Sequence, residues 1–155
     1  MKNINIVLVN PEIPQNTGNI SRTCAVTGAA LHIIKPIGFE ISDRTLKRAG
    51  LDYWDKLDVT YYDSFDEFMA KYSDAPMLFF TAHAKMPFFQ AEYPDGIFLI
   101  FGKESCGLPE DIVEENLDRT VRIPMIDGVR CLNLSNSVAV ATYEALRRRG
   151  YEGLI

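Results

Sequence analysis

The chain has 155 residues, which at about 150 residues per domain predicts a single domain over residues 1–155. Hydrophobic residues make up 47% of the chain, which excludes global disorder. The formal net charge of -5 disfavours a strongly basic, nonspecific nucleic-acid binder, although a local basic patch is still compatible with it. No apolar run reaches about 18 residues, so the sequence predicts no membrane span. The apolar run at 4–9 lacks a small-residue cleavage site and therefore reads as a strand, not a signal peptide.

Short apolar runs alternate with helical patterns along the chain. The predicted strands are residues 4–9, 31–34, 59–62, 77–81, 97–101 and 120–125. The predicted helices are residues 16–27, 44–50, one that begins after Ser64, one from Pro109 to about 116, and 134–149. Gly28 and Gly150 end the first and the last of them. Ser64 caps the third, and Glu67 stands at the capping-box spacing from it. Phe65, Phe68, Met69 and Tyr72 give the third of these helices one apolar stripe.

This alternation predicts an α/β fold with a mostly parallel sheet and helices on both faces. Ligands of such sheets bind outside the carboxyl ends of the strands. We therefore expect a ligand site among the loops that follow Val9, Thr81, Phe101 and Met125.

The cysteines and histidines indicate no metal site. Cys24, Cys106 and Cys131 are odd in number and form no CxxC pair, and the two histidines lie far apart in the sequence. We expect a reducing, cytoplasmic location without disulfides. The lack of a histidine near Cys131 in sequence also disfavours this thiol as a catalytic nucleophile.

The first loop and helix start, residues 10–22, carry two prolines, and either Asn16 or Thr17 could cap the helix. Gly18 lowers helix propensity in the first turn, which is easier to understand if something approaches the backbone closely. Arg22 follows about one turn later. An ordinary helix-start loop with a solvated arginine explains the same spacing.

The second loop, residues 101–109, joins a buried strand to a helix and has two glycines. It is not a phosphate-binding P-loop, because Ile97 stands where a glycine is needed and Glu104 follows Lys103. The third segment, residues 123–137, holds Asn133 and Ser135, of which one suffices to cap the last helix. The surplus indicates a ligand or partner chain, or redundant capping.

Together these segments resemble the three motifs of the SPOUT class of S-adenosylmethionine-dependent RNA methyltransferases. The first motif is Asn-Pro-x-x-Pro-x-Asn-x-Gly-Asn-x-x-Arg at 10–22, and the second is Phe-Gly-x-Glu-x-x-Gly-Leu-Pro at 101–109. The third is Ile-Pro-Met followed by Arg-x-Leu-Asn-Leu-Ser-Asn-Ser-Val-Ala, at 123–139. The chain is most similar to the TrmL group, which 2'-O-methylates the wobble nucleotide of leucine tRNAs. The resemblance implies a C-terminal trefoil knot, a homodimer, S-adenosyl-L-methionine as cofactor and a tRNA partner.

Residue by residue, the resemblance implies that Thr81, Gly102, Ile123 and Cys131 bind the cofactor. Relatives often carry Ser at position 131 and Arg at position 106, where this chain has cysteines. Glycines and main-chain groups can hold an adenine, and such contacts tolerate side-chain change.

Arg22 and Tyr143 are the catalytic candidates that the resemblance implies, with Asn133 and Ser135 positioning the ribose or the cofactor. Arg stays protonated near neutral pH, so Arg22 is assigned to charge stabilisation and not to base catalysis. Arg44, Lys47 and Arg48 share one face of the predicted helix 44–50 and are either phosphate contacts or a solvated face.

Three alternatives stay open. The chain could methylate another tRNA or rRNA site, or keep the fold as a non-catalytic RNA-binding dimer. An unrelated nucleotide-binding enzyme is disfavoured by the missing phosphate loops.

Overall fold

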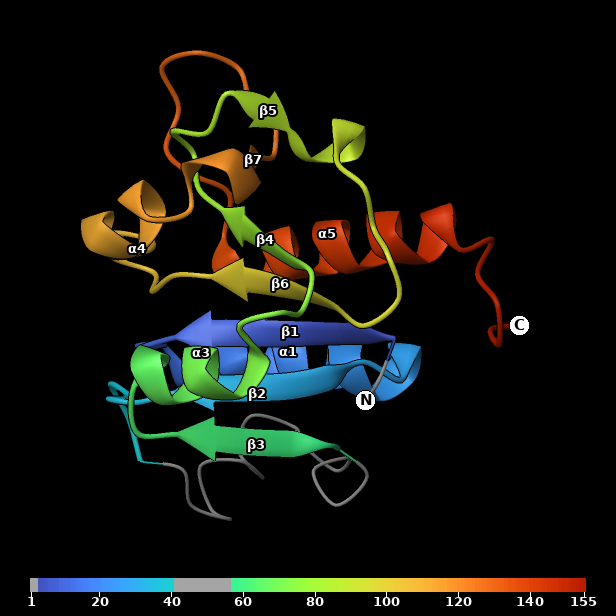
Figure 1. The fold of residues 1–155 in the computed structure, drawn as a ribbon, viewed down its shortest axis with the longest axis horizontal. Helices are drawn as coiled ribbons and strands as arrows, with labels where there is room; N and C mark the ends of the chain where they lie inside the picture. Colours follow the sequence, from blue (N-terminus) through green and yellow to red (C-terminus); the bar gives the residue numbers. More distant parts are fainter. Residues whose placement is uncertain (1–2, 41–56) are drawn as a thin grey trace.

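The computed structural model describes residues 3–40 and 57–155. Within them, seven strands form one sheet in the order β3-β2-β1-β6-β4-β7-β5, and every strand pairing is parallel. The strands are β1 Ile4–Val9, β2 Ala30–Ile34, β3 Val59–Tyr62, β4 Met77–Phe80, β5 Met86–Pro87, β6 Ile97–Phe101 and β7 Thr120–Arg122. The predicted α/β class with a parallel sheet is confirmed (Figure 1).

Four α-helices lie in the described part of the chain: α1 Pro14–Thr27, α3 Phe65–Tyr72, α4 Glu110–Glu114 and α5 Leu134–Arg148. Gly28 ends α1 in the left-handed conformation with φ 73°, as its position in the sequence predicts. Short 3-10 turns lie at Phe88–Gln90 and Leu117–Arg119. The predicted helix 44–50 lies outside the described residues.

The two faces of the sheet bury alternate residues of the same strands. On one face, Ile6 and Leu8 of β1 pack with Ile20 of α1 and Val138 of α5. On the other face, Val7 packs in a cluster that includes Phe68 of α3 and Ile112 of α4. This period of two is what a sheet covered on both sides requires. Figure 1 shows α3 in front of the sheet and α1 behind it.

The helix caps follow the local sequence with small differences. The Ser64 hydroxyl accepts a hydrogen bond from the Glu67 amide at 3.1 Å, and the Glu67 carboxylate accepts from the amide of Asp63 at 2.7 Å. The capping box is therefore present, shifted by one residue on its return bond. The sequence predicts Pro109 as the first helical residue, but it stands at the N-cap of α4, so the helix begins one residue later, at Glu110.

The strand predicted over 120–125 is wrong at its end. It stops at Arg122, because the chain leaves the sheet there and runs through an irregular segment to α5. The two-residue strand β5 was not predicted, since two residues carry no periodic pattern.

The sheet has a topological switch point between the adjacent strands β1 and β6. After β1 the chain enters α1 on one face, and after β6 it enters α4 on the opposite face. The two loops therefore diverge and leave a crevice at the carboxyl ends of these strands, where ligands bind in open α/β sheets.

Candidate functional site

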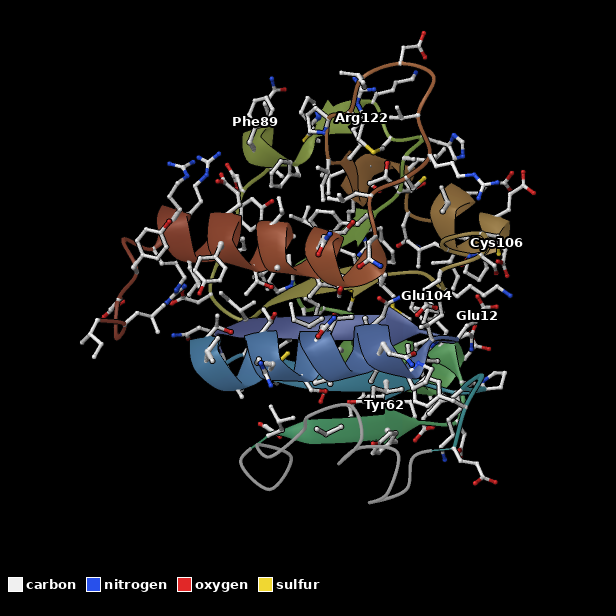
Figure 2. The ribbon with its side chains drawn as sticks, turned by 180° about the vertical axis from the view of Figure 1, so that it is seen from behind. Glu12, Tyr62, Phe89, Glu104, Cys106 and Arg122 are labelled. Atoms are coloured by element: carbon white, nitrogen blue, oxygen red, sulfur yellow. The ribbon has the colours of Figure 1, made fainter. Side chains whose placement is uncertain are left out.

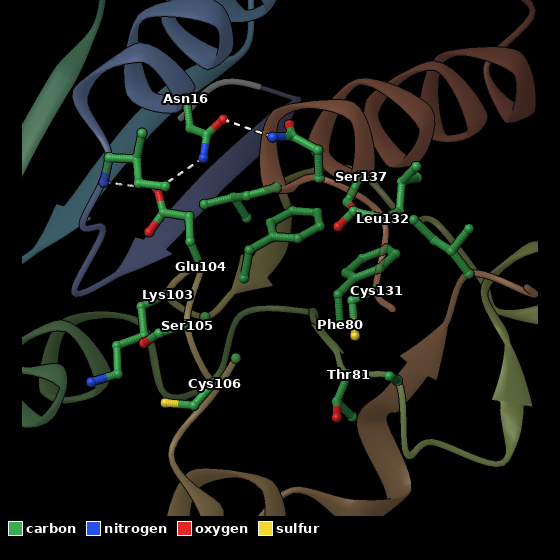
Figure 3. Close-up of a pocket in the computed structure, with 18 of the residues that line it drawn as sticks. Asn16, Phe80, Thr81, Lys103, Glu104, Ser105, Cys106, Cys131, Leu132 and Ser137 are labelled. Carbon is green, nitrogen blue, oxygen red and sulfur yellow. Dashed lines mark hydrogen bonds between the residues drawn. The ribbon is translucent and has the colours of Figure 1, made fainter. Parts of the chain in front are cut away.

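A cavity of about 380 Å³ lies at the carboxyl ends of the central strands. This volume is within the range of small-molecule sites. Four segments form its wall. They are Ile13 with Asn16 of α1, residues 80–83 at the end of β4, residues 101–107 at the end of β6, and the segment from β7 into α5 with Ile123, Met125, residues 131–134 and Ser137. The prediction that distant strand-end loops converge on one pocket is confirmed (Figure 3).

The four residues expected at the cofactor all line this cavity. Thr81 follows β4, Gly102 follows β6, and Ile123 and Cys131 belong to the segment between β7 and α5. The structure thus brings together positions that are up to 50 residues apart in the sequence. Their roles at the cofactor stay predictions.

Glu104 joins the β6 loop to the β1 loop. Its carboxylate accepts hydrogen bonds from the amide of Glu12 at 2.7 Å, the amide of Ile13 at 3.0 Å and the Asn16 side-chain amide at 3.1 Å. Ile13 is the N-cap residue of α1 and has no side-chain acceptor, and the first turn of α1 has no acidic residue. Glu104 therefore supplies a negative charge at this helix N-terminus from a distant part of the chain.

Glu12 joins the same two loops from the other side, because its carboxylate bonds to a residue of the β6 loop. Its carboxylate accepts from the amide of Ser105 and from the Ser105 hydroxyl, both at 3.0 Å, and lies 3.8 Å from the ammonium of Lys103. Two glutamates thus exchange hydrogen bonds between the two loops that diverge from the switch point. Figure 2 shows Glu12, Glu104 and Cys106 gathered at one end of the sheet.

Asn16 extends this network to α5. Its carbonyl oxygen accepts from the side-chain amide of Asn133 at 3.1 Å (Figure 3). Asn133 is the N-cap of α5, and its carbonyl oxygen accepts from the amides of Ser135 and Asn136 and from the Ser135 hydroxyl at 2.7 Å. Capping by Asn133 is confirmed, and the same side chain also donates to Asn16, while Ser135 bonds back to Asn133. Neither Asn16 nor Thr17 caps α1, so that expectation is wrong; both lie inside the helix.

Gly102 is required by the protein's own backbone. A Cβ atom there would lie 1.9 Å from the carbonyl carbon of Gly107 and 2.0 Å from the amide nitrogen of Leu108. The loop is closed by hydrogen bonds in both directions between Lys103 and Gly107. The close approach that this glycine permits is therefore explained by the turn itself, without a ligand.

Arg22 and Tyr143 do not line the cavity of this chain. Arg22 is exposed on α1 and Tyr143 is 46% exposed on α5, two helices that pack on the same face of the sheet. Asn133 is on the cavity wall, and Ser135 is buried beside it. The basic candidates Arg44, Lys47 and Arg48 lie outside the described residues.

Several side chains on the wall had no role assigned from sequence. Glu104 and Asn16 belong to the quoted motifs, but their mutual contact depends on strand order. Phe80, His83 and Ser137 also line the cavity.

Within residues 3–40 and 57–155, no three His, Cys, Asp or Glu side chains group in a way that could hold a metal ion. None of the helices in those ranges is long and apolar enough to cross a membrane.

Known proteins resemble the chain over almost its whole length. The SpoU rRNA Methylase family matches residues 3–143. A protein of Escherichia coli (strain K12) named tRNA (cytidine(34)-2'-O)-methyltransferase is 43% identical over 153 residues, covering 98% of each chain. A solved structure described as giving insights into the 2-OH methylation of C/U34 on tRNA is 44% identical, with TM-score 0.88, covering 96% of this chain and 97% of that one.

A more distant structure shares the fold. An AdoMet-bound rRNA methyltransferase from Sinorhizobium meliloti is 21% identical, with TM-score 0.83, and the match covers 94% of this chain and 56% of that one.

Proposed function

Because the chain belongs to the SpoU rRNA methylase family, we propose that it is a tRNA methyltransferase that uses S-adenosyl-L-methionine to methylate the 2'-hydroxyl of nucleotide 34. The target is a cytidine or modified uridine at the wobble position of leucine tRNAs. One observation carries the proposal: the loops that hold the three motifs enclose a single cavity at the topological switch point. The names of the relatives supply the position on the tRNA.

The cavity has the chemistry that the methyl donor needs. Its wall combines apolar side chains, among them Phe80 and Ile123, with the polar and glycine residues of the loop 102–107. Apolar walls with a few polar groups suit a nucleoside that carries an amino-acid tail. We assign donor binding to Thr81, Gly102, Ile123 and Cys131. When bound, S-adenosylmethionine supplies a methyl group on a positively charged sulfur.

The network of Glu104, Asn16 and Asn133 keeps the donor-binding loops in one arrangement. Holding reacting groups in place can lower a barrier by several kcal/mol. We assign Asn133 and Ser135 to this positioning, because their side chains are fixed by hydrogen bonds to each other at the start of α5.

Arg22 and Tyr143 complete the catalytic set. Arg22 stabilises negative charge on the ribose oxygen or on the adjacent phosphate, because a guanidinium stays protonated and cannot act as a base near neutral pH. Direct in-line transfer to the 2'-oxygen requires no covalent enzyme intermediate and no metal.

We propose that the protein acts as a homodimer, with the RNA site shared between copies. Arg22 and Tyr143 lie away from the cavity of their own chain, so a second copy is needed to bring them to a bound ribose. Val26 of α1 and Val140 of α5 are 58% and 40% exposed, which fits a face that another copy covers. The C-terminal trefoil knot, the single domain over residues 1–155 and the cytoplasmic location belong to the same proposal.

The experiment incubates purified protein with S-adenosylmethionine and unmodified leucine tRNA, and measures methylation of nucleotide 34 by mass spectrometry. Arg22→Ala is expected to keep donor affinity, measured by calorimetric titration, and to lose most of its turnover. Arg147→Ala is the matched control, since Arg147 is an exposed arginine paired with Glu144 at the far end of α5.

Methylation at another nucleotide would refute the assigned position. Donor binding without methylation of any tRNA or rRNA would favour the non-catalytic dimer, and full turnover by Arg22→Ala would remove Arg22 from the mechanism.

A further inference from the structure

Two of the three cysteines lie on the wall of the same cavity. Cys106 and Cys131 are both exposed and line it, whereas Cys24 is 1% exposed on the buried face of α1. Figure 3 shows Cys106 and Cys131 coming from different loops. Cys106 stands in the turn closed between Lys103 and Gly107, and Cys131 lies shortly before α5. Two separate segments thus each contribute a cysteine to the lining of one cavity.

These thiols are not explained by the contacts that hold the site together. Glu104, Asn16 and Asn133 join the loops, and they bond to backbone amides, to the Ser135 hydroxyl and to each other. The network that holds the donor-binding loops therefore uses neither thiol.

Exposure decides which thiols can react. A thiolate is the nucleophile in thiol chemistry, and it must meet its reagent in solvent. Cys106 and Cys131 meet this condition. Burial raises the pKa of the Cys24 thiol to about 12, so Cys24 stays protonated and out of reach. Cys24 therefore serves as an internal control for thiol labelling.

We propose that Cys106 and Cys131 form a thiol-modification site, where a small cellular disulfide attaches to the cavity wall and prevents the methyl donor from binding. This inference rests on the proposed function, because it places the donor in that cavity.

The chemical step is thiol–disulfide exchange. The cysteine gives up its proton, and its thiolate attacks one sulfur of the small disulfide. A new S–S bond forms between protein and reagent while the reagent's own S–S bond breaks. The second reagent sulfur leaves as a thiolate and takes up the proton. The cysteine sulfur is oxidised, the leaving sulfur is reduced, and a reducing thiol reverses the step.

The adduct blocks the donor by occupying its space. The cavity has about 380 Å³, and a tripeptide attached to its wall cannot share it with a nucleoside of similar size. Bound donor should in turn shield both thiols, since the two events compete for one volume.

The test uses oxidised glutathione as the probe. Wild-type protein is titrated with S-adenosylmethionine by calorimetry before treatment, after treatment, and after dithiothreitol. Intact-mass and peptide analysis locate the adducts. Cys106→Ser, Cys131→Ser and the double variant are each compared with themselves before and after treatment, so a change in basal affinity does not affect the comparison.

We expect glutathionyl groups on Cys106 and Cys131 and none on Cys24. We expect the Kd for the donor to rise at least about tenfold on treatment and to recover with dithiothreitol, because adduct and donor compete. Saturating donor should slow labelling at both sites. The double variant should show the same Kd before and after treatment.

Adducts that leave the Kd unchanged would overturn the inference while the proposed function stands. A double variant whose Kd for the donor still rises on treatment would also overturn it. So would a protein mass lowered by two hydrogens, because that mass indicates a disulfide within the protein and not a glutathione adduct. If untreated wild-type protein does not bind the donor at all, the proposed function fails first, and this inference fails with it.

Discussion

Removing the carboxylate of Glu104 should destabilise the protein by about 3 kcal/mol. Glu104→Ala deletes three hydrogen bonds to an ionised acceptor, two of them partly buried and the one to Ile13 exposed. Hydrogen bonds to charged groups contribute about 1.5 kcal/mol or more when shielded, and less where water can replace them. The amide of Glu12 and the side chain of Asn16 then lack their acceptor, and only the contacts of the Glu12 carboxylate still join the β1 loop to the β6 loop.

Urea denaturation at a fixed protein concentration measures this change, because a predicted dimer makes stability depend on concentration. Glu114→Ala, at an exposed glutamate of α4, is the matched control and should change the free energy of unfolding by less than about 0.5 kcal/mol. A double-mutant cycle with Asn16→Ala should give a coupling of about 1 kcal/mol. Calorimetric titration should also show weaker donor binding in Glu104→Ala.

If Glu104→Ala unfolds at the same urea concentration as Glu114→Ala, the hydrogen bonds of Glu104 do not stabilise the fold and the reasoning is refuted. A cycle with no coupling would mean that Glu104 and Asn16 act independently, despite the 3.1 Å between them.

Three further predictions concern the fold and the RNA contact. Burial lowers the pKa of His32 from 6.5 to about 4, so between these pH values the unfolded chain binds more protons than the folded one. We therefore expect the free energy of unfolding of the wild-type protein to fall by up to about 3 kcal/mol from pH 6.5 to 4. Denaturation series across that range should show a smaller fall for His32→Leu. Gly102→Ala places a Cβ against the backbone of Gly107, and the free energy of unfolding should drop by at least about 2 kcal/mol; an unchanged value would contradict the close approach. Replacing Arg44, Lys47 and Arg48 together with Ala should weaken tRNA binding. Filter binding at several salt concentrations should show that the slope of log K against log salt concentration becomes shallower by about one or more, which corresponds to the loss of at least one phosphate contact.

Local patterns determined much of the fold. The strands β1, β3 and β6 begin and end at the predicted residues, because each is a short apolar run between turn or polar residues. The stop at Gly28 and the cap at Ser64 also depend only on neighbouring residues. The rule for ligand sites in parallel sheets then indicated the correct edge of the sheet.

Only the tertiary structure decided how the site is held together. Glu104 bonds to an amide 92 residues earlier, and Asn133 bonds to a side chain 117 residues earlier. Such contacts depend on which strands are neighbours and on the face to which each loop turns. The alternation of strands and helices predicts a parallel sheet but does not fix the order in which its strands lie. For the same reason, the sequence could not show that the backbone of Gly107 leaves no room for a side chain at Gly102. Nor could it show that Cys106 and Cys131 line one cavity.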